Sequence, residues 1–400
     1  RGQIFGGGRR ARGVYDGTPA WLPTTAWQWA SITGTRWTDY IKDNGTGLAP
    51  QVTANDPGVS KTYGAVWDYS GPCYSKARHE FWMFGGGHAG TTINILTRWN
   101  LNTDSPSVSM MCAPSSESVR RTQALDNYTT YIANGPCFSD GKPYSPHSYY
   151  NNLYLDGVDQ FMSFVIDGIA TSADGSTMGG VTASFYTIAA FGRNDSTWLP
   201  ANTYTDVVSS PAGANRGPRP ISADGLSVYY WADSGGLRKW HQPTDTHSVI
   251  GGTGTKPPNP GPCCNNGSDV SLHIERDSTA GWNVKTCDLS TGTQTTVTVG
   301  GYSIGTGLQC YGVEYVSATD TYITVWVDST SYNGTASITS ILVVELELTS
   351  ASAATATLKT MTGTAPTKCG SYCGMGYDPT FGVVLLAMDE TTPIHCFKVA

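Results

Sequence analysis

Short apolar or aromatic runs separated by turn residues recur along this chain, and helical periodicity is almost absent. The clearest unit starts near Tyr63 and has runs expected as strands at 63–68, 80–84, 94–101 and 107–111. Its turns contain Gly and Pro, which favour tight turns and close backbone approach. A period of about 40 to 50 residues with four strands per unit is typical of propeller blades. The pattern therefore predicts an all-β propeller.

The pattern returns five more times. Further strands are expected at 148–156, 160–165, 183–191 and after Trp198; at 219–223, 226–231, 236–241 and 246–250; near Cys264 and at 270–274, 282–289 and 294–299; at 312–316, 321–327, 338–348 and 354–360; and at 374–377, 382–388 and 394–399. The last unit has three strands, and the run 27–32 belongs to no unit. Because closure removes exposed sheet edges, we expect 27–32 to pair with 394–399 as the outer strand of the last blade. We thus expect one propeller over residues 21–400 with about six four-stranded blades, or alternatively seven, after an N-terminal arm at 1–20.

The composition excludes two classes of partner. Charged residues make up only 14% of the chain, and the net charge is −7, so there is no basic stripe to neutralise nucleic-acid phosphates. No apolar run approaches the roughly 20 residues of a membrane-spanning helix. We expect neither a nucleic-acid partner nor a membrane span.

The cysteines point to an oxidising location. Neither the adjacent pair Cys263-Cys264 nor the close pair Cys369 and Cys373 is matched by a second pair or by nearby histidines, which argues against a zinc site. We expect at least six of the ten to form disulfides, as in extracellular proteins, with reduced core thiols as the alternative. The disulfide candidates are Cys73, Cys112, Cys137, Cys263, Cys264, Cys287, Cys310, Cys369, Cys373 and Cys396.

Two segments resemble kelch-like propellers related to the central domain of galactose oxidase. The first is Phe84-Gly85-Gly86-Gly87-His88, followed by Asn94 and Trp99-Asn100-Leu101. The second, Asp140-Gly141-Lys142-Pro143-Tyr144-Ser145-Pro146-His147-Ser148-Tyr149, is similar to a segment of kelch-like proteins encoded by bacteria and tailed phages, with Pro146 in place of an arginine. The resemblance extends from about residue 21 to 164 and is architectural beyond that. It implies the propeller fold and carries no settled activity.

The candidate ligand-binding residues lie in these motifs, in loops beside inner strands. In propellers such loops face the central channel or one of its ends. We expect a polar site near the axis, the alternative being loops held by hydrogen bonds to the backbone. The candidates are His88, Asn94, Asp140, His147 and Tyr149.

A Gly-rich arm at the N-terminus carries the one basic cluster. It is interpreted either as a flexible tail or as an anchor that orders on a partner. The partner would be another virion protein or a second copy of this acidic chain. The anchor residues are Arg1, Arg9, Arg10 and Arg12.

These features favour a non-enzymatic protein of a virion surface or another extracellular location, with a role in attachment or decoration and possible binding of surface glycans. Motifs for serine hydrolases, phosphate loops and zinc helices are absent, and we expect no catalytic residue, metal or cofactor. The copper-radical pattern of the oxidases is not matched around His395-Cys396, where strand alternation suffices to explain the pair. The alternatives are a secreted carbohydrate-active enzyme, such as a polysaccharide lyase or an oxidase, and an extracellular glycan-binding module.

Overall fold

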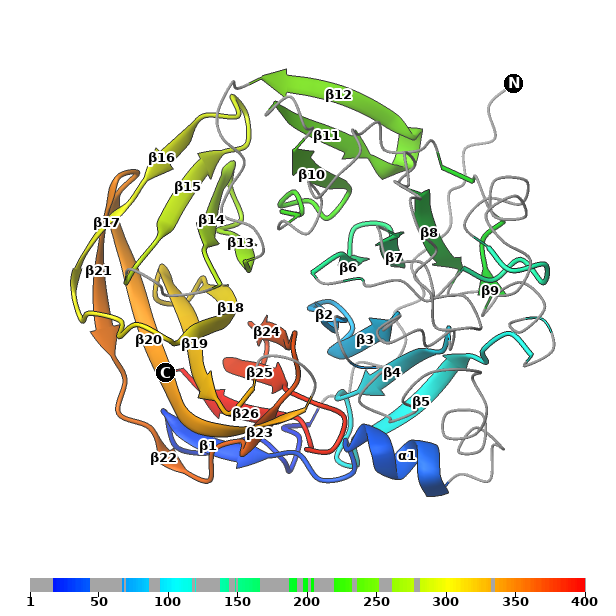
Figure 1. The fold of residues 1–400 in the computed structure, drawn as a ribbon, viewed down its shortest axis with the longest axis horizontal. Helices are drawn as coiled ribbons and strands as arrows, with labels where there is room; N and C mark the ends of the chain where they lie inside the picture. The colour runs from blue at the N-terminus through cyan, green and yellow to red at the C-terminus, as the bar shows by residue number, and fades with distance from the viewer. Residues whose placement is uncertain are drawn as a thin grey trace.

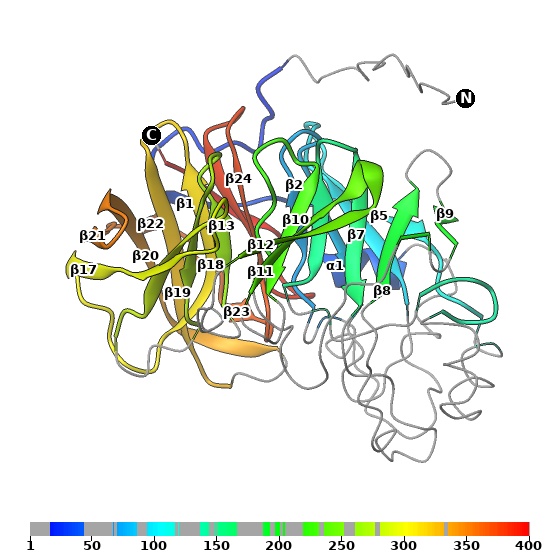
Figure 2. The same ribbon diagram turned by 90° about the horizontal axis from the view of Figure 1, so that it is seen from above.

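Six small sheets form a closed ring in the computed structural model, so the protein is a six-bladed β-propeller (Figure 1). Figure 2 shows the ring from the side. The structure describes residues 17–43, 67, 70–85, 94–116, 119, 137–143, 148, 150–165, 187–192, 197–200, 203–204, 219–231, 236–251, 261–276, 281–331 and 335–399. The six-blade prediction is confirmed, and the seven-blade alternative is wrong.

The strands of each blade lie in chain order from the axis outward. Blade 1 contains β2 (Cys73–Ser75), β3 (Glu80–Phe84), β4 (Leu96–Asn100) and β5 (Ser107–Cys112). Blade 2 contains β6 (Asn152–Leu155), β7 (Gln160–Val165), β8 (Thr187–Gly192) and β9 (Thr197–Trp198). Blade 3 contains β10 (Ser227–Trp231), β11 (Leu237–His241) and β12 (Thr246–Gly251). Blade 4 contains β13 (Cys263–Asn265), β14 (Val270–Ile274), β15 (Val284–Asp288) and β16 (Gln294–Thr296). Blade 5 contains β18 (Gln309–Val316), β19 (Thr321–Ser329), β20 (Ala336–Ser350) and β21 (Ala353–Leu358). Blade 6 contains β24 (Gly374–Asp378), β25 (Val383–Ala387) and β26 (His395–Lys398).

The N-terminal strand closes the ring as predicted. β1 (Gln28–Ser31) pairs antiparallel with β26, with Ala30 opposite Cys396 and Ser31 opposite His395. Blade 6 therefore takes its outer strand from the beginning of the chain and its inner strands from the end. This pairing leaves the final blade with no open edge at β26.

Apolar packing fills the seams between blades. The described residues form six hydrophobic clusters, one at each seam. On β3, Phe81 and Met83 face the seam with blade 6, whereas Trp82 and Phe84 face the seam with blade 2. Because a strand between two blades is buried on both faces, its sequence is a continuous apolar run without alternation.

One strand expected in blade 1 is wrong. The run 63–68 was expected to be the first strand, but β2 takes that place, and Trp67 has helical geometry and is buried. Its ring packs edge-on against Trp37 and Trp99, with centroids 6.3 and 5.7 Å away. The Trp67 ring thus belongs to an aromatic cluster rather than to a sheet ladder. The remainder of the expected strand, 63–66 and 68, lies outside the described residues.

The inner strand expected in blade 3 is reduced to a single bridge between Ile221 and Val228. Other elements had no counterpart in the sequence analysis. They are the helix α1 (Trp37–Asp43), the 3₁₀ turn η2 (Gln242–Thr244), and the strands β17 (Thr298–Gly301), β22 (Thr362–Gly363) and β23 (Lys368–Cys369). β17 and β22 pair in parallel with β21 and β1, so the chain leaving one blade extends the outer edge of the next. No helix of the described residues is long and apolar enough to cross a membrane.

Candidate functional site

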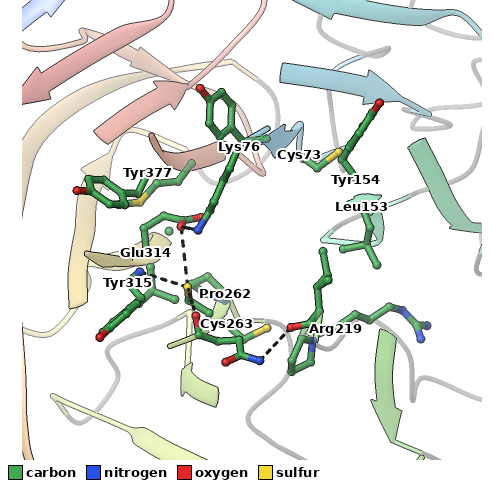
Figure 3. Close-up of a pocket in the computed structure, with 18 of the residues that line it drawn as sticks. Cys73, Lys76, Leu153, Tyr154, Arg219, Pro262, Cys263, Glu314, Tyr315 and Tyr377 are labelled. Carbon is green, nitrogen blue, oxygen red and sulfur yellow. Dashed lines mark hydrogen bonds and ion pairs between the residues drawn. The ribbon is translucent and has the colours of Figure 1, made fainter. Parts of the chain in front are cut away.

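The inner strands enclose a cavity of about 490 Å³ on the propeller axis (Figure 3). All six blades contribute to its wall. The contributing segments include 71–74, 152–154, 219–225, 262–267, 311–315 and part of 373–379. A volume of this size is typical of small-ligand sites.

One end of the cavity is formed by the turns that join the first and second strands of the blades; we call it the turn end. Each of these six turns has one residue with positive φ, between 54° and 79°. They are His79, Asp159, Gly225, Gly267, Asp320 and Gly382. Five of the six are Asp or Gly, which adopt such backbone angles more readily than most residues, and Gly225 and Gly267 line the cavity itself.

An ion pair crosses the cavity near the turn end. Lys76 Nζ of blade 1 lies 3.2 Å from Glu314 Oε2 of blade 5, although blade 6 separates those blades in the ring. Figure 3 shows Lys76 extending toward Glu314, with Tyr315 and Tyr377 on the same side of the cavity. The pair places one positive and one negative group where a ligand entering this mouth would meet them.

Glu314 also faces a thiol. Cys264 Sγ lies 3.9 Å from Glu314 Oε2 and accepts a hydrogen bond of 3.2 Å from the Tyr315 backbone N–H. Burial, reinforced by the charge of Glu314, raises the pKa of Cys264 to about 12. Burial likewise raises the pKa of Cys263. Both side chains are therefore neutral thiols near pH 7 and lack the thiolate character of a nucleophile.

Asp156 ties blade 2 to blade 1. Its carboxylate accepts hydrogen bonds from Ser75 Oγ at 2.5 Å and from the Lys76 backbone N–H at 3.0 Å. Burial raises the pKa of Asp156, while these hydrogen bonds oppose the increase. Because both oxygens are occupied by neighbouring turns, this carboxyl group holds the wall of the cavity together.

A second buried carboxylate ties blade 6 to blade 1. Asp378 Oδ2 accepts from the Tyr74 hydroxyl at 2.6 Å and lies 2.5 Å from His79 Nδ1. Burial, followed by the charge of Asp378, raises the pKa of Tyr74, so this cavity-lining phenol stays protonated. The carboxylate again joins two blades.

The structure brings two of the sequence-predicted site residues together, away from the cavity wall. Asn94 Nδ2 donates to Ser115 Oγ at 3.0 Å and to the Pro143 carbonyl at 2.8 Å. Ser115 Oγ in turn donates to Asp140 at 3.0 Å. Neither Asn94 nor Asp140 lines the axial cavity, and their bonds hold the segment that leads from blade 1 to blade 2. His88, His147 and Tyr149, and the arm residues Arg1, Arg9, Arg10 and Arg12, lie outside the described residues.

The cysteines differ from the sequence prediction. All ten are free thiols in the structure, so the expected six or more are not in disulfides there. Adjacent positions on a strand point to opposite faces, which separates the side chains of Cys263 and Cys264 on β13. Another thiol forms a hydrogen bond to the backbone: Cys373 Sγ donates to the Met388 carbonyl at 3.1 Å.

The residues that line the cavity could not be found from local sequence motifs. Lys76, Glu314 and Tyr150 come from three different blades and meet only because the ring closes. The one sequence signal was that Tyr150 and Glu314 fall within the expected first strands 148–156 and 312–316, and Lys76 had no such signal. In the part of the chain that the structure describes, no group of three or more His, Cys, Asp or Glu side chains is arranged to hold a metal ion.

No family model matches this chain, and no curated protein matches it significantly.

Proposed function

We propose that this chain is a kelch-like propeller of the type encoded by tailed phages and bacteria, and that it serves as a non-enzymatic attachment protein of a virion or cell surface. Its ligand in this proposal is a surface glycan that enters the axial cavity. The observation that carries the proposal is that cavity: segments of all six blades surround a space of about 490 Å³. Tyr154, Tyr311 and Tyr377 are among the residues that line it. Aromatic rings combined with a few polar groups suit sugar rings, which present both apolar faces and hydroxyls.

Recognition is favoured over catalysis by the bonding of the reactive groups. The Asp156 and Asp378 carboxylates are bonded to neighbouring turns, and the Cys264 thiol has a pKa of about 12. A general base must instead reach a proton on the substrate, and a nucleophile must be activated. The proposal includes the N-terminal arm as an anchor to other virion proteins or to a second copy of the chain.

A substitution at the turn end tests the role of the cavity. Ala223 is exposed and lines the cavity in the turn of blade 3, two residues before the positive-φ Gly225. Ala318 is exposed at the equivalent position of blade 5, two residues before Asp320, but is not part of the cavity lining. Ala223→Trp should obstruct the mouth, whereas Ala318→Trp introduces the same ring outside it.

Binding of both variants and the wild type to an array of neutral and acidic oligosaccharides is the measurement. We expect Ala223→Trp to abolish binding and Ala318→Trp to retain it. Undiminished binding by Ala223→Trp would place recognition elsewhere. Release of unsaturated or oxidised sugars by the wild type would favour the lyase or oxidase alternative.

A further inference from the structure

The end of the cavity opposite the turns has a different chemistry; we call it the far end. Tyr150 precedes β6 and Tyr311 lies in the first half of β18, so both belong to the end where the inner strands begin. Both side chains line the cavity. Behind them stand Tyr372 and Arg276, which are buried at 2% and 7% exposure.

Arg276 is a buried cation without a carboxylate partner among the described residues. Its guanidinium carbon lies 4.4 Å from the ring centroid of Tyr372 and 5.6 Å from that of Tyr311. Its Nη2 donates to Gln309 Oε1 at 2.7 Å, but its Nε has no hydrogen-bond partner in the described part of the chain. Burial of a cation is costly unless a negative group compensates it, and the neutral amide of Gln309 does not.

Tyr150 adds a second donor without an acceptor. Its ring packs edge-on against Tyr372, with centroids 5.1 Å apart, and its hydroxyl is buried with no partner among the described residues. Burial raises the pKa of Tyr150, and the positive charge of Arg276 opposes that increase. The phenol is therefore a neutral donor in the cavity wall, and the guanidinium charge lies close behind it.

Asp389 is an acidic side chain whose charge reaches this region, but its oxygens are occupied by hydrogen bonds within its own turn. The charge of Asp389 acts on Cys373, a cavity-lining thiol that also feels Arg276. Asp389 Oδ1, however, accepts from the backbone N–H groups of Thr391 and Thr392 at 2.6 and 3.0 Å. Its Oδ2 accepts from the Thr392 hydroxyl at 2.8 Å. This carboxylate caps its own turn and does not contact Arg276.

We propose that the far end of the cavity binds the carboxylate of an acidic sugar. The carboxylate accepts a hydrogen bond from the Tyr150 hydroxyl, and its negative charge compensates the positive charge of Arg276. This inference rests on the proposed glycan-binding function and names the class of glycan. Two buried cations lie in or behind the cavity wall, and they face different groups: Arg219 stacks over the Phe164 ring at 4.7 Å, whereas Arg276 stacks over Tyr372, the ring that packs against Tyr150. The single charge of Arg276 beside Tyr150 is matched by a monoanionic carboxylate. A phosphate dianion would leave a negative charge in excess. Tyr311 supplies an aromatic side chain beside the sugar ring.

The test uses calorimetric titration of the full-length protein with uronic-acid trisaccharides, with neutral trisaccharides of the same linkage, and with free glucuronate, glucose and inorganic phosphate. The informative variants are Tyr150→Phe, which removes only the hydroxyl, and Arg276→Gln, which removes the charge. Two matched controls are available. Tyr322→Phe removes another buried hydroxyl without a described partner, outside the cavity lining, and Arg36→Gln removes an exposed charge.

We expect the uronic-acid ligand to bind more tightly than the neutral one. Tyr150→Phe should weaken acidic binding about tenfold or more, as for loss of a hydrogen bond to a charged group, and leave neutral binding unchanged. Arg276→Gln should remove the preference for acid, while both controls retain it. If Arg276→Gln fails to fold, Tyr150→Phe alone decides the outcome.

Equal binding of acidic and neutral glycans in all variants would overturn this inference and leave the glycan-binding function standing. Binding of free glucuronate but of no oligosaccharide would sustain the carboxylate site and refute glycan attachment. Tighter binding of phosphate than of glucuronate would overturn the choice of a carboxylate.

Discussion

Buried His273 should make the propeller lose stability at mildly acidic pH. It lies on β14 at 1% exposure, its Nε2 is 2.6 Å from Ser271 Oγ, and its ring packs edge-on against Trp231. Burial, followed by the charge of Lys285, lowers the pKa of His273 from its ordinary 6.5 to about 3. The imidazole is therefore neutral in the folded protein at pH values where the unfolded chain protonates it.

The sign and size of the effect follow from proton linkage. Between pH 6.5 and 3 the unfolded state binds more protons at this site than the folded state, so stability falls as the pH falls through that window. With these two pKa values, the loss at pH 5 relative to pH 7.5 is about 2 kcal/mol. His395, whose pKa burial also lowers, acts in the same direction. Asp156 and Glu390, whose pKa values burial raises, act in the opposite direction, so only a comparison of variants isolates His273.

The variant is His273→Gln, whose amide retains a polar group toward Ser271 and does not titrate. Urea unfolding followed by tryptophan fluorescence at pH 7.5, 6 and 5 gives the free energy of unfolding for wild type and variant. We expect the variant's loss between pH 7.5 and 5 to be smaller than that of the wild type by about 2 kcal/mol. His241→Gln, at a partly buried position of blade 3, is the matched control for the substitution itself. Parallel pH profiles for wild type and His273→Gln would refute a neutral, buried His273.

Three further predictions concern closure, thiols and the arm. Trp29→Ala should destabilise the fold by about 3–5 kcal/mol, because this 5%-exposed ring packs edge-on against Phe397 in the closing blade; a cost below 1 kcal/mol in urea unfolding would contradict that role. Thiol titration of the denatured, unreduced protein should find ten free groups, and four or fewer would restore the disulfide interpretation. Deletion of residues 1–12 should leave the melting temperature unchanged yet abolish incorporation into particles or oligomers, and normal incorporation of the truncated chain would exclude the anchor role.

The second strand of each blade and the closure of the ring could be predicted because each depends on a pattern visible in the sequence itself. A strand between two blades needs apolar groups on both faces, and β3 and β25 are such continuous runs. The unmatched N-terminal run and the incomplete last blade together predicted the pairing of β1 with β26. Counting strands was sufficient there, because in a closed ring an extra strand at one end of the chain can complete the blade that lacks a strand at the other end.

The inner strands and the cavity were harder to predict. β2 and β13 have three residues each and mix thiol, hydroxyl, amide and phenol groups, so they carry no apolar pattern. The apolar run ending near Trp67 gave a stronger but misleading signal, because its aromatic residue serves a cluster of tryptophans. The candidate site residues Asn94 and Asp140, taken from local motifs, form hydrogen bonds within a connecting segment and do not line the axial cavity.

The two ends of the cavity differ because ring closure places different demands on them. At the turn end the first strands of neighbouring blades converge, and Asp156 and Asp378 join blade 1 to its neighbours through donors on adjacent turns. Carboxylates used in this way have little capacity left for a ligand. At the far end two donors, the Tyr150 hydroxyl and Arg276 Nε, have no acceptor among the described residues. A buried donor without a partner favours a ligand that supplies the missing acceptor, so discrimination among ligands should arise at the far end. The turn end should control entry of the ligand.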